Sequence, residues 1–138
     1  MYSVVVPVFN HASYLQAAVA SVLRSSLVSE VILVDDGSSD GSAAVVERLT
    51  ASGRGRVRNL TEPAGENRGA AARLNELVSS AREDWVAILD SDDVCVAGVV
   101  VTKRPPDRGL GVDQGEEAGR HRRAAGPDDT IVAVKSEV

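Results

Sequence analysis

Three aspartates stand close together directly after an apolar run, and they are the strongest chemical signal in the chain. The run spans residues 85–89, and the carboxylates belong to Asp90, Asp92 and Asp93. Negative charge at the edge of a core is costly unless something pairs with it. A divalent cation is the usual partner of closely spaced carboxylates that offer only oxygen ligands. The pattern also suits a turn of solvated aspartates, so for this cluster alone both interpretations stay open.

A second acidic loop lies upstream, at residues 34–42, and carries Asp35, Asp36 and Gly37. Two carboxylates at a strand end can accept hydrogen bonds from a base N–H and from ribose hydroxyls, and glycine lets the backbone turn tightly or approach a ligand. The alternative is a plain strand–turn–helix connector. The loop lacks the glycine spacing of phosphate-binding and dinucleotide-binding loops. Bound phosphates would therefore need positive charge from a cation held by Asp90 and Asp92.

A third segment, residues 67–75, opens a helix whose first turns consist of small residues. Small residues let a helix approach a sheet or a ligand closely, and the helix N-terminus together with Arg68 or Arg73 could meet an anion. The alternative is an Ala-rich amphipathic helix with solvated arginines. For either arginine alone, this second interpretation is favoured.

The elements that position these residues alternate along the chain. The predicted strands are residues 3–8, 30–34, 56–60 and 85–89, and the predicted helices are residues 14–23 with Ser13 as N-cap, about 42–51, and the part of 67–82 that follows a loop. This alternation indicates an α/β fold with an open, mostly parallel sheet and the Rossmann-like order β-α-β-α-β-α-β. The polar loops that follow Val8, Val34 and Leu89 then meet at one sheet edge, where doubly wound sheets bind nucleotides.

Composition narrows the class of protein. The chain has 138 residues, enough for one domain with a core, of which 43% are hydrophobic, 25% charged and 3% aromatic. A net charge of −5 offers no broad basic surface for nucleic acid. The single cysteine, Cys95, excludes an intrachain disulfide, and its apolar neighbours indicate a buried side chain. Without a membrane-length apolar run or a basic leader, we expect a cytoplasmic protein, with membrane association through partners left open.

The composition changes after about residue 101. Residues 103–130 are rich in Arg, Gly, Pro, Asp and Glu and lack apolar periodicity. We predict a folded domain at residues 1–101 and a low-order, irregular tail at residues 102–138, with a short terminal strand at residues 130–134. The tail also resembles GC-rich DNA translated in a wrong reading frame, a hypothesis that sequencing of the locus tests.

Four motifs in order resemble the family 2 glycosyltransferases. They are residues 3–10 (Ser-Val-Val-Val-Pro-Val-Phe-Asn), residues 34–40 (Val-Asp-Asp-Gly-Ser-Ser-Asp), Asn67-x-Gly69 with Ala72 and Asn75, and residues 89–93 (Leu-Asp-Ser-Asp-Asp). Each motif is weak, but their order and spacing over residues 2–95 make the resemblance specific. It implies a GT-A fold and an enzyme that takes sugar from a nucleoside diphosphate. Residues 1–101 would be a truncated nucleotide-sugar-binding domain, with a UDP-sugar as the expected donor and cell-wall or polysaccharide synthesis as the setting.

The resemblance also implies roles for individual residues. The nucleotide-binding set is Pro7, Val8, Phe9, Asp35, Asp36, Asn67, Arg73 and Asp90, and the metal-binding set is Asp92 and Asp93. The first three would line the base pocket. Asp36 would accept the base N–H, and Asp35 would support its loop. Asp90-Ser91-Asp92 looks like the family's Asp-x-Asp motif, where Mg²⁺ or Mn²⁺ would bridge the diphosphate and stabilise the leaving nucleotide.

The family's reaction transfers the sugar to an acceptor hydroxyl with inversion and needs a general base. No motif identifies that base here, although the tail contains Glu116, Glu117, Asp128 and Asp129. The acceptor, whether carbohydrate, lipid or protein, also stays unassigned. A sheet that ends after its fourth strand leaves an unpaired edge, which predicts self-association.

Three functional interpretations remain open. The chain is an active transferase, or a donor-binding part that binds nucleotide and transfers sugar poorly or not at all. A third possibility is a non-catalytic α/β module such as a flavodoxin-like receiver. The loop at residues 7–10 and the cluster at residues 90–93 argue against this third interpretation. A receiver also needs a lysine at a strand end, whereas both lysines, Lys103 and Lys135, lie in the tail.

Overall fold

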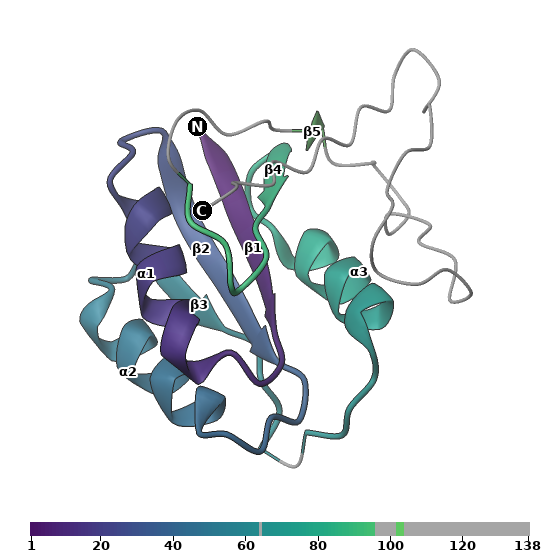
Figure 1. Cartoon of the computed structure of the whole chain (residues 1–138). Coiled ribbons are helices and arrows are strands. Elements are labelled where there is room, and N and C mark those ends of the chain that lie inside the picture. The colour runs from purple at the N-terminus through teal and green to yellow at the C-terminus, as the bar shows by residue number, and fades with distance from the viewer. Residues whose placement is uncertain (64, 96–101, 104–138) are drawn as a thin grey trace.

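The computed structural model describes residues 1–63, 65–95 and 102–103. Its sheet has the strand order β3-β2-β1-β4-β5 (Figure 1). The strands are β1 (Tyr2–Val8), β2 (Val28–Asp35), β3 (Val57–Asn59), β4 (Trp85–Ile88) and β5 (Thr102–Lys103), and the helices are α1 (Ala12–Leu23), α2 (Ser42–Ser52) and α3 (Ala70–Ser80). The first four strands are parallel and β5 is antiparallel to β4. The expected open, mostly parallel α/β sheet is therefore confirmed.

Strand β1 lies in the middle of the sheet because its side chains are apolar on both faces. Val4, Val5 and Val6 have no exposed surface. Val5 pairs with Ile32 of β2 on one side and with Ile88 of β4 on the other. A strand buried on both faces is expected to have such a continuous apolar run.

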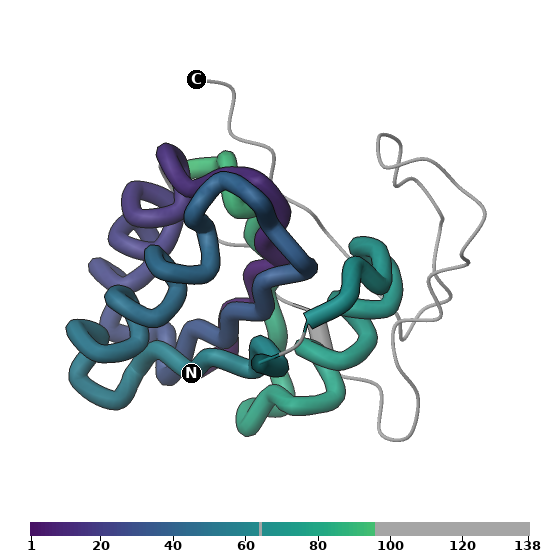
Figure 2. Tube along the Cα trace, turned by 90° about the horizontal axis from the view of Figure 1, so that it is seen from below, coloured from purple at the N-terminus to yellow at the C-terminus, as the bar shows by residue number. Residues whose placement is uncertain are grey.

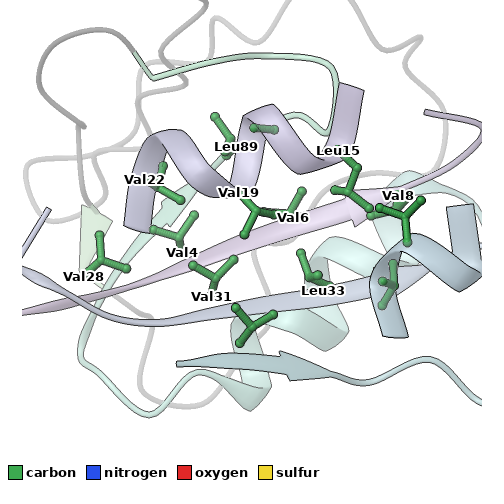
Figure 3. Packing of buried hydrophobic residues seen from close by; sticks show 14 of the residues in the cluster. Val4, Val6, Val8, Leu15, Val19, Val22, Val28, Val31, Leu33 and Leu89 are labelled. Atoms are coloured by element: carbon green, nitrogen blue, oxygen red, sulfur yellow. The ribbon is translucent and has the colours of Figure 1, made fainter. Parts of the chain in front are cut away.

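The helices cover the two faces of the sheet unequally. Helices α1 and α2 pack on one face and α3 packs on the other (Figure 2). The larger cluster, between the sheet and α1 and α2, includes Val4, Val6, Val8, Leu15, Val19, Val22, Val31, Leu33, Val45 and Val46 (Figure 3). The smaller cluster, under α3, consists of Val5, Ile32, Val34, Leu77, Val78, Ala81 and Val86. The side chains of alternate residues in each strand thus pack on opposite faces of the sheet, as the pleat of a β-strand requires.

The start of α1 differs from the expectation. The helix begins at Ala12, so Ser13 lies inside it, and the N-cap is His11, whose side chain makes no cap hydrogen bond. The cap comes instead from Asp40, whose Oδ2 accepts a hydrogen bond from the Ala12 amide at 3.0 Å, while its Oδ1 accepts one from the Ser42 amide at 3.0 Å. One carboxylate therefore caps both α1 and α2. Hydrogen bonds from the Ser42 hydroxyl and the Ala12 amide hold the pKa of Asp40 below its usual range.

Strand β5 was not expected, because two residues without an apolar pattern leave no periodic signal. Lys103 pairs with Trp85, and Thr102 pairs with Val86. The outer edge of β4 therefore carries a partner strand, and self-association stays a prediction. The domain boundary at residue 101 also stays a prediction. The expected strand at residues 130–134 lies outside the described residues, as do the tail carboxylates.

The single cysteine of the chain was expected to be buried. Cys95 is only partly buried: it packs against the larger cluster, and its amide donates to Ser21 Oγ at 2.9 Å. No helix in the part of the chain that the structure describes has the length and apolar character that crossing a membrane requires.

A buried carboxylate lies near the amino ends of the strands. Glu30 has 3% of its surface exposed. Its carboxylate accepts hydrogen bonds from Ser3 Oγ at 2.8 Å, Arg58 Nη1 at 2.8 Å and the Arg82 amide at 2.7 Å. Burial raises the pKa of Glu30, but the hydrogen bonds from Arg58, the Arg82 amide and Ser3 outweigh it, so the pKa is lowered overall. This group ties β1, β2 and β3 to the turn before β4.

Gly53 closes the turn between α2 and β3 because no larger residue fits there. A Cβ atom at this position would lie 2.5 Å from Val57 Cγ2 and 2.9 Å from the Leu49 carbonyl oxygen. We expect Gly53→Ala to lower the free energy of unfolding by about 1–3 kcal/mol through overpacking. Urea denaturation checks this value. The neighbouring exposed Ser52→Ala is the control and should change stability by less than about 0.5 kcal/mol; equal effects of the two changes would contradict the packing explanation.

Candidate functional site

The loops that follow β1, β2 and β4 meet at the carboxyl edge of the parallel strands. The Asn10 amide donates to Ser38 Oγ at 2.9 Å, and the Ser39 amide donates to Asn10 Oδ1 at 2.9 Å. His11 Nδ1 lies 2.6 Å from Ser91 Oγ, which joins the first loop to the third. Residues far apart in sequence therefore form one polar surface at the edge where doubly wound sheets bind ligands.

The acidic cluster of Asp90, Asp92 and Asp93 occupies one side of this edge. Each carboxylate offers an oxygen, and these oxygens all lie within 4.8 Å of one another. Asp90 and Asp92 are exposed and Asp93 is half-buried. Two ligands on opposite sides of one Mg²⁺ ion are about 4.2 Å apart. The donors are all oxygens and lie close enough together to share one ion, so the residues present fit a small, hard divalent cation.

The carboxylate of Asp36 is bound to the beginning of α3. Its Oδ1 accepts hydrogen bonds from the Arg68 amide at 2.7 Å and from Arg73 Nε at 2.9 Å, and its Oδ2 accepts one from the Gly69 amide at 3.0 Å. Asp36 is almost fully buried. Its expected hydrogen bond to a base N–H would therefore have to share oxygens that already accept three protein donors, and it stays a prediction.

Arg73 is fully buried, so the expectation of a solvated arginine is wrong at this position. Besides Asp36, its guanidinium donates to Glu76 Oε2 at 2.9 Å and to the Glu66 carbonyl at 3.0 Å. Burial lowers the pKa of Arg73, but the bonds to Asp36 and Glu76 outweigh it and raise the pKa overall. The signal was present in the sequence, because Arg73 stands four residues before Leu77 on the buried side of the helix. Arg68, in contrast, is half exposed, as expected.

Asp35 closes the turn of the second loop. Its Oδ2 accepts a hydrogen bond from the Ser38 amide at 3.1 Å, and its own amide donates to Thr61 Oγ1 at 2.9 Å. Its other carboxylate oxygen, Oδ1, is buried without a hydrogen bond within the described part of the chain. Gly37 has φ +78°, and a Cβ there would lie 3.2 Å from the Asn67 backbone nitrogen. Glycine thus lets the second loop and the segment before α3 approach each other.

Four residues of the expected nucleotide-binding set, the base-pocket residues Pro7, Val8 and Phe9 together with Asn67, differ in how much surface they present. Phe9 is 46% exposed, Pro7 is half-buried, and Asn67 is exposed. The Val8 side chain is fully buried in the larger cluster, and its carbonyl accepts a hydrogen bond from the Asp36 amide at 2.8 Å. Only Pro7, Phe9 and Asn67 of this group therefore present side chains at the surface of the site.

A family model described as glycosyl transferase family 2 matches residues 3–100. The chain belongs to this family. Glycosyltransferase GlyG of Streptococcus pneumoniae is 36% identical over 104 residues, which cover 74% of this chain and 33% of GlyG. The family 2 chain thus spans about a third of the length of this relative.

Two solved structures show the same fold as this family 2 chain. The mannosyltransferase PcManGT from Pyrobaculum calidifontis, in complex with GDP-Man and Mn²⁺, superposes with a TM-score of 0.62 at 27% identity, over 70% of this chain and 28% of that one. S. aureus TarS in complex with UDP superposes with a TM-score of 0.57 at 25% identity, over 67% of this chain and 28% of that one. The expected GT-A type of fold is therefore confirmed over the part that matches.

Proposed function

We propose that this chain carries the donor-binding part of a glycosyltransferase, which holds the nucleoside diphosphate of a sugar donor through a divalent cation. The acidic cluster carries the proposal, because it lies at the carboxyl edge of the sheet within the segment that matches the family. Two structural relatives bind GDP-Man with Mn²⁺ and UDP, respectively. These relatives support a nucleotide-sugar donor, with a UDP-sugar expected, and either Mn²⁺ or Mg²⁺ as the cation.

The cation would supply the positive charge that the diphosphate needs. The loop at residues 34–42 lacks the glycine spacing of a phosphate-binding loop. The guanidinium of Arg73 is buried among Asp36, Glu76 and the Glu66 carbonyl. Asp92 and Asp93 would hold the cation with help from Asp90, because carboxylate oxygens are the ligands that Mg²⁺ and Mn²⁺ prefer. The bound cation supplies charge stabilisation for the leaving nucleotide.

The remaining residues would orient the donor. Phe9 and Pro7 would contact the base, Asn67 would border the same pocket, and Asp36 with Asp35 would hold the polar edge of the base in place. Transfer with inversion additionally needs a base near the acceptor hydroxyl, and the acceptor is expected to be a carbohydrate, a lipid or a protein. Because the chain spans about a third of its relative's length, nucleotide binding without efficient transfer is the second candidate. Membership of the family argues against a receiver-like module.

Calorimetry tests this function with UDP, GDP and dTDP, each with and without Mn²⁺. We expect wild-type binding to require Mn²⁺, and Asp92→Ala to weaken it by about 100-fold, since the change removes a proposed metal ligand. Asp84→Ala is the matched control, because Asp84 is an exposed aspartate just before β4, at the opposite end of that strand. Equal affinity in wild type and Asp92→Ala, or no binding of any nucleotide by the folded protein, would refute the proposal.

A further inference from the structure

His11 contacts several neighbours where the loops meet. The backbone amide of His11 donates to Ser42 Oγ at 3.1 Å. Its carbonyl accepts hydrogen bonds from the Tyr14 amide at 3.0 Å and the Leu15 amide at 3.1 Å, which begin α1. Its ring stands edge-on to the Tyr14 ring, with the centroids 6.1 Å apart. The backbone of His11 is therefore fixed at the start of α1, and its ring has the Tyr14 ring as a neighbour.

The ring presents its two nitrogens to two neighbouring residues of the acidic loop. Nδ1 lies 2.6 Å from Oγ of Ser91, a residue with 3% of its surface exposed, and Nε2 lies 3.9 Å from Asp92 Oδ2. A ring nitrogen that faces a carboxylate favours carrying the proton. In the tautomer with its proton on Nε2, the Ser91 hydroxyl donates to Nδ1.

We infer that His11 is a positioning residue for the cation site, acting through Nδ1 on Ser91. The inference rests on the proposed function. Three carboxylates with oxygens within 4.8 Å repel one another, and a bound cation would reduce that repulsion. Ser91 stands between Asp90 and Asp92, so anchoring its hydroxyl would restrict the movement of the backbone that carries both carboxylates. A site ordered in advance binds more tightly, because less conformational entropy is lost on binding.

Four variants separate this role from a direct contact with the cation. His11→Ala removes both nitrogens, and Ser91→Ala removes the partner of Nδ1. His11→Asn keeps a polar atom near the position of Nδ1, whereas His11→Gln keeps one near the position of Nε2. The titration uses Mn²⁺ itself, and the loss of the free-ion signal in electron paramagnetic resonance measures its affinity. Circular dichroism confirms that each variant is folded, and Ser91→Ala remains informative if His11→Ala is not.

We expect His11→Ala and Ser91→Ala each to weaken Mn²⁺ binding by about 10-fold or more, as the loss of a residue that orients metal ligands does. His11→Asn should restore most of the affinity and His11→Gln should not. The double variant His11→Ala/Ser91→Ala should bind no more weakly than either single variant, because both changes break the same contact.

The other outcomes have distinct meanings. If wild type binds Mn²⁺ and Asp92→Ala does not, but the His11 variants match wild type, the inference is wrong and the proposed function stands. If His11→Gln instead of His11→Asn restored the affinity for Mn²⁺, His11 would not act through Ser91. If the folded wild-type protein does not bind Mn²⁺, both the inference and the proposed cation site are wrong.

Discussion

Replacing Arg73 with alanine should lower the free energy of unfolding by about 3 kcal/mol. The guanidinium has no exposed surface and binds Asp36, Glu76 and the Glu66 carbonyl. Removing one member of a buried ion pair leaves the other charge uncompensated, which typically costs about 3–5 kcal/mol. The lower end applies here, because the amides of Arg68 and Gly69 still donate to Asp36. Urea denaturation followed by circular dichroism measures the change.

Arg68 provides the matched control for this experiment. It lies just before α3, its side chain is half exposed, and its charge approaches Glu76 only to 3.9 Å. Arg68→Ala should therefore change stability by less than about 0.5 kcal/mol. Arg73→Lys should fall between Arg73→Ala and wild type, because an ammonium group does not reproduce the planar fork of guanidinium donors. A loss below about 1 kcal/mol in Arg73→Ala would show that the buried pair does not hold α3 against the second loop.

Replacing Glu30 with alanine should have the second largest effect, a loss of about 2–3 kcal/mol. The change leaves the Ser3 hydroxyl, the Arg82 amide and Arg58 without their shared acceptor. The loss is smaller than for Arg73, because Arg58 is about a quarter exposed and regains contact with water. Thermal and urea unfolding check the value. Glu47→Ala, an exposed glutamate on α2, is the control and should be nearly neutral.

Acid should remove the contribution of Glu30. Its pKa is lowered in the folded protein relative to the unfolded chain, so the unfolded state binds the proton more readily. The stabilisation is therefore fully present above the ordinary glutamate pKa of about 4.3 and is lost as the pH falls through the lower folded-state pKa. The stability difference between wild type and Glu30→Gln should shrink between pH 6 and pH 3. A difference independent of pH would show that the ionised form of Glu30 is not the one that the fold stabilises.

The sheet was predictable because its strands are apolar on both faces and its polar loops follow them. That signal is local: a run such as Val4, Val5 and Val6 needs no distant information to be recognised as buried. The helix caps were not predictable in this way, since the carboxylate that caps α1 belongs to Asp40, 28 residues away from Ala12. A cap that arrives from another loop leaves no pattern beside the helix it stabilises.

The candidate site was predictable in its carboxylates but not in the contacts that hold them. Asp90, Asp92 and Asp93 form a cluster within one segment, so their proximity follows from the sequence. The partnership of His11 with Ser91 depends on β1 and β4 lying side by side, and nothing near His11 in the sequence indicates it. The burial of Arg73 was predictable, because its position on the apolar side of α3 argues against a solvated side chain.

The strand order has a consequence for the chain as it leaves the ribosome. Strand β1 is made first and gains β2 early, but its other neighbour, β4, begins only at Trp85 (Figure 1). Until then the growing chain presents an apolar strand with one open edge, a template for pairing with other chains. When β4 pairs with β1 it covers that edge, and it also brings the acidic loop next to His11. The acidic cluster of Asp90, Asp92 and Asp93 thus takes its place beside His11 only when this open edge of β1 is covered.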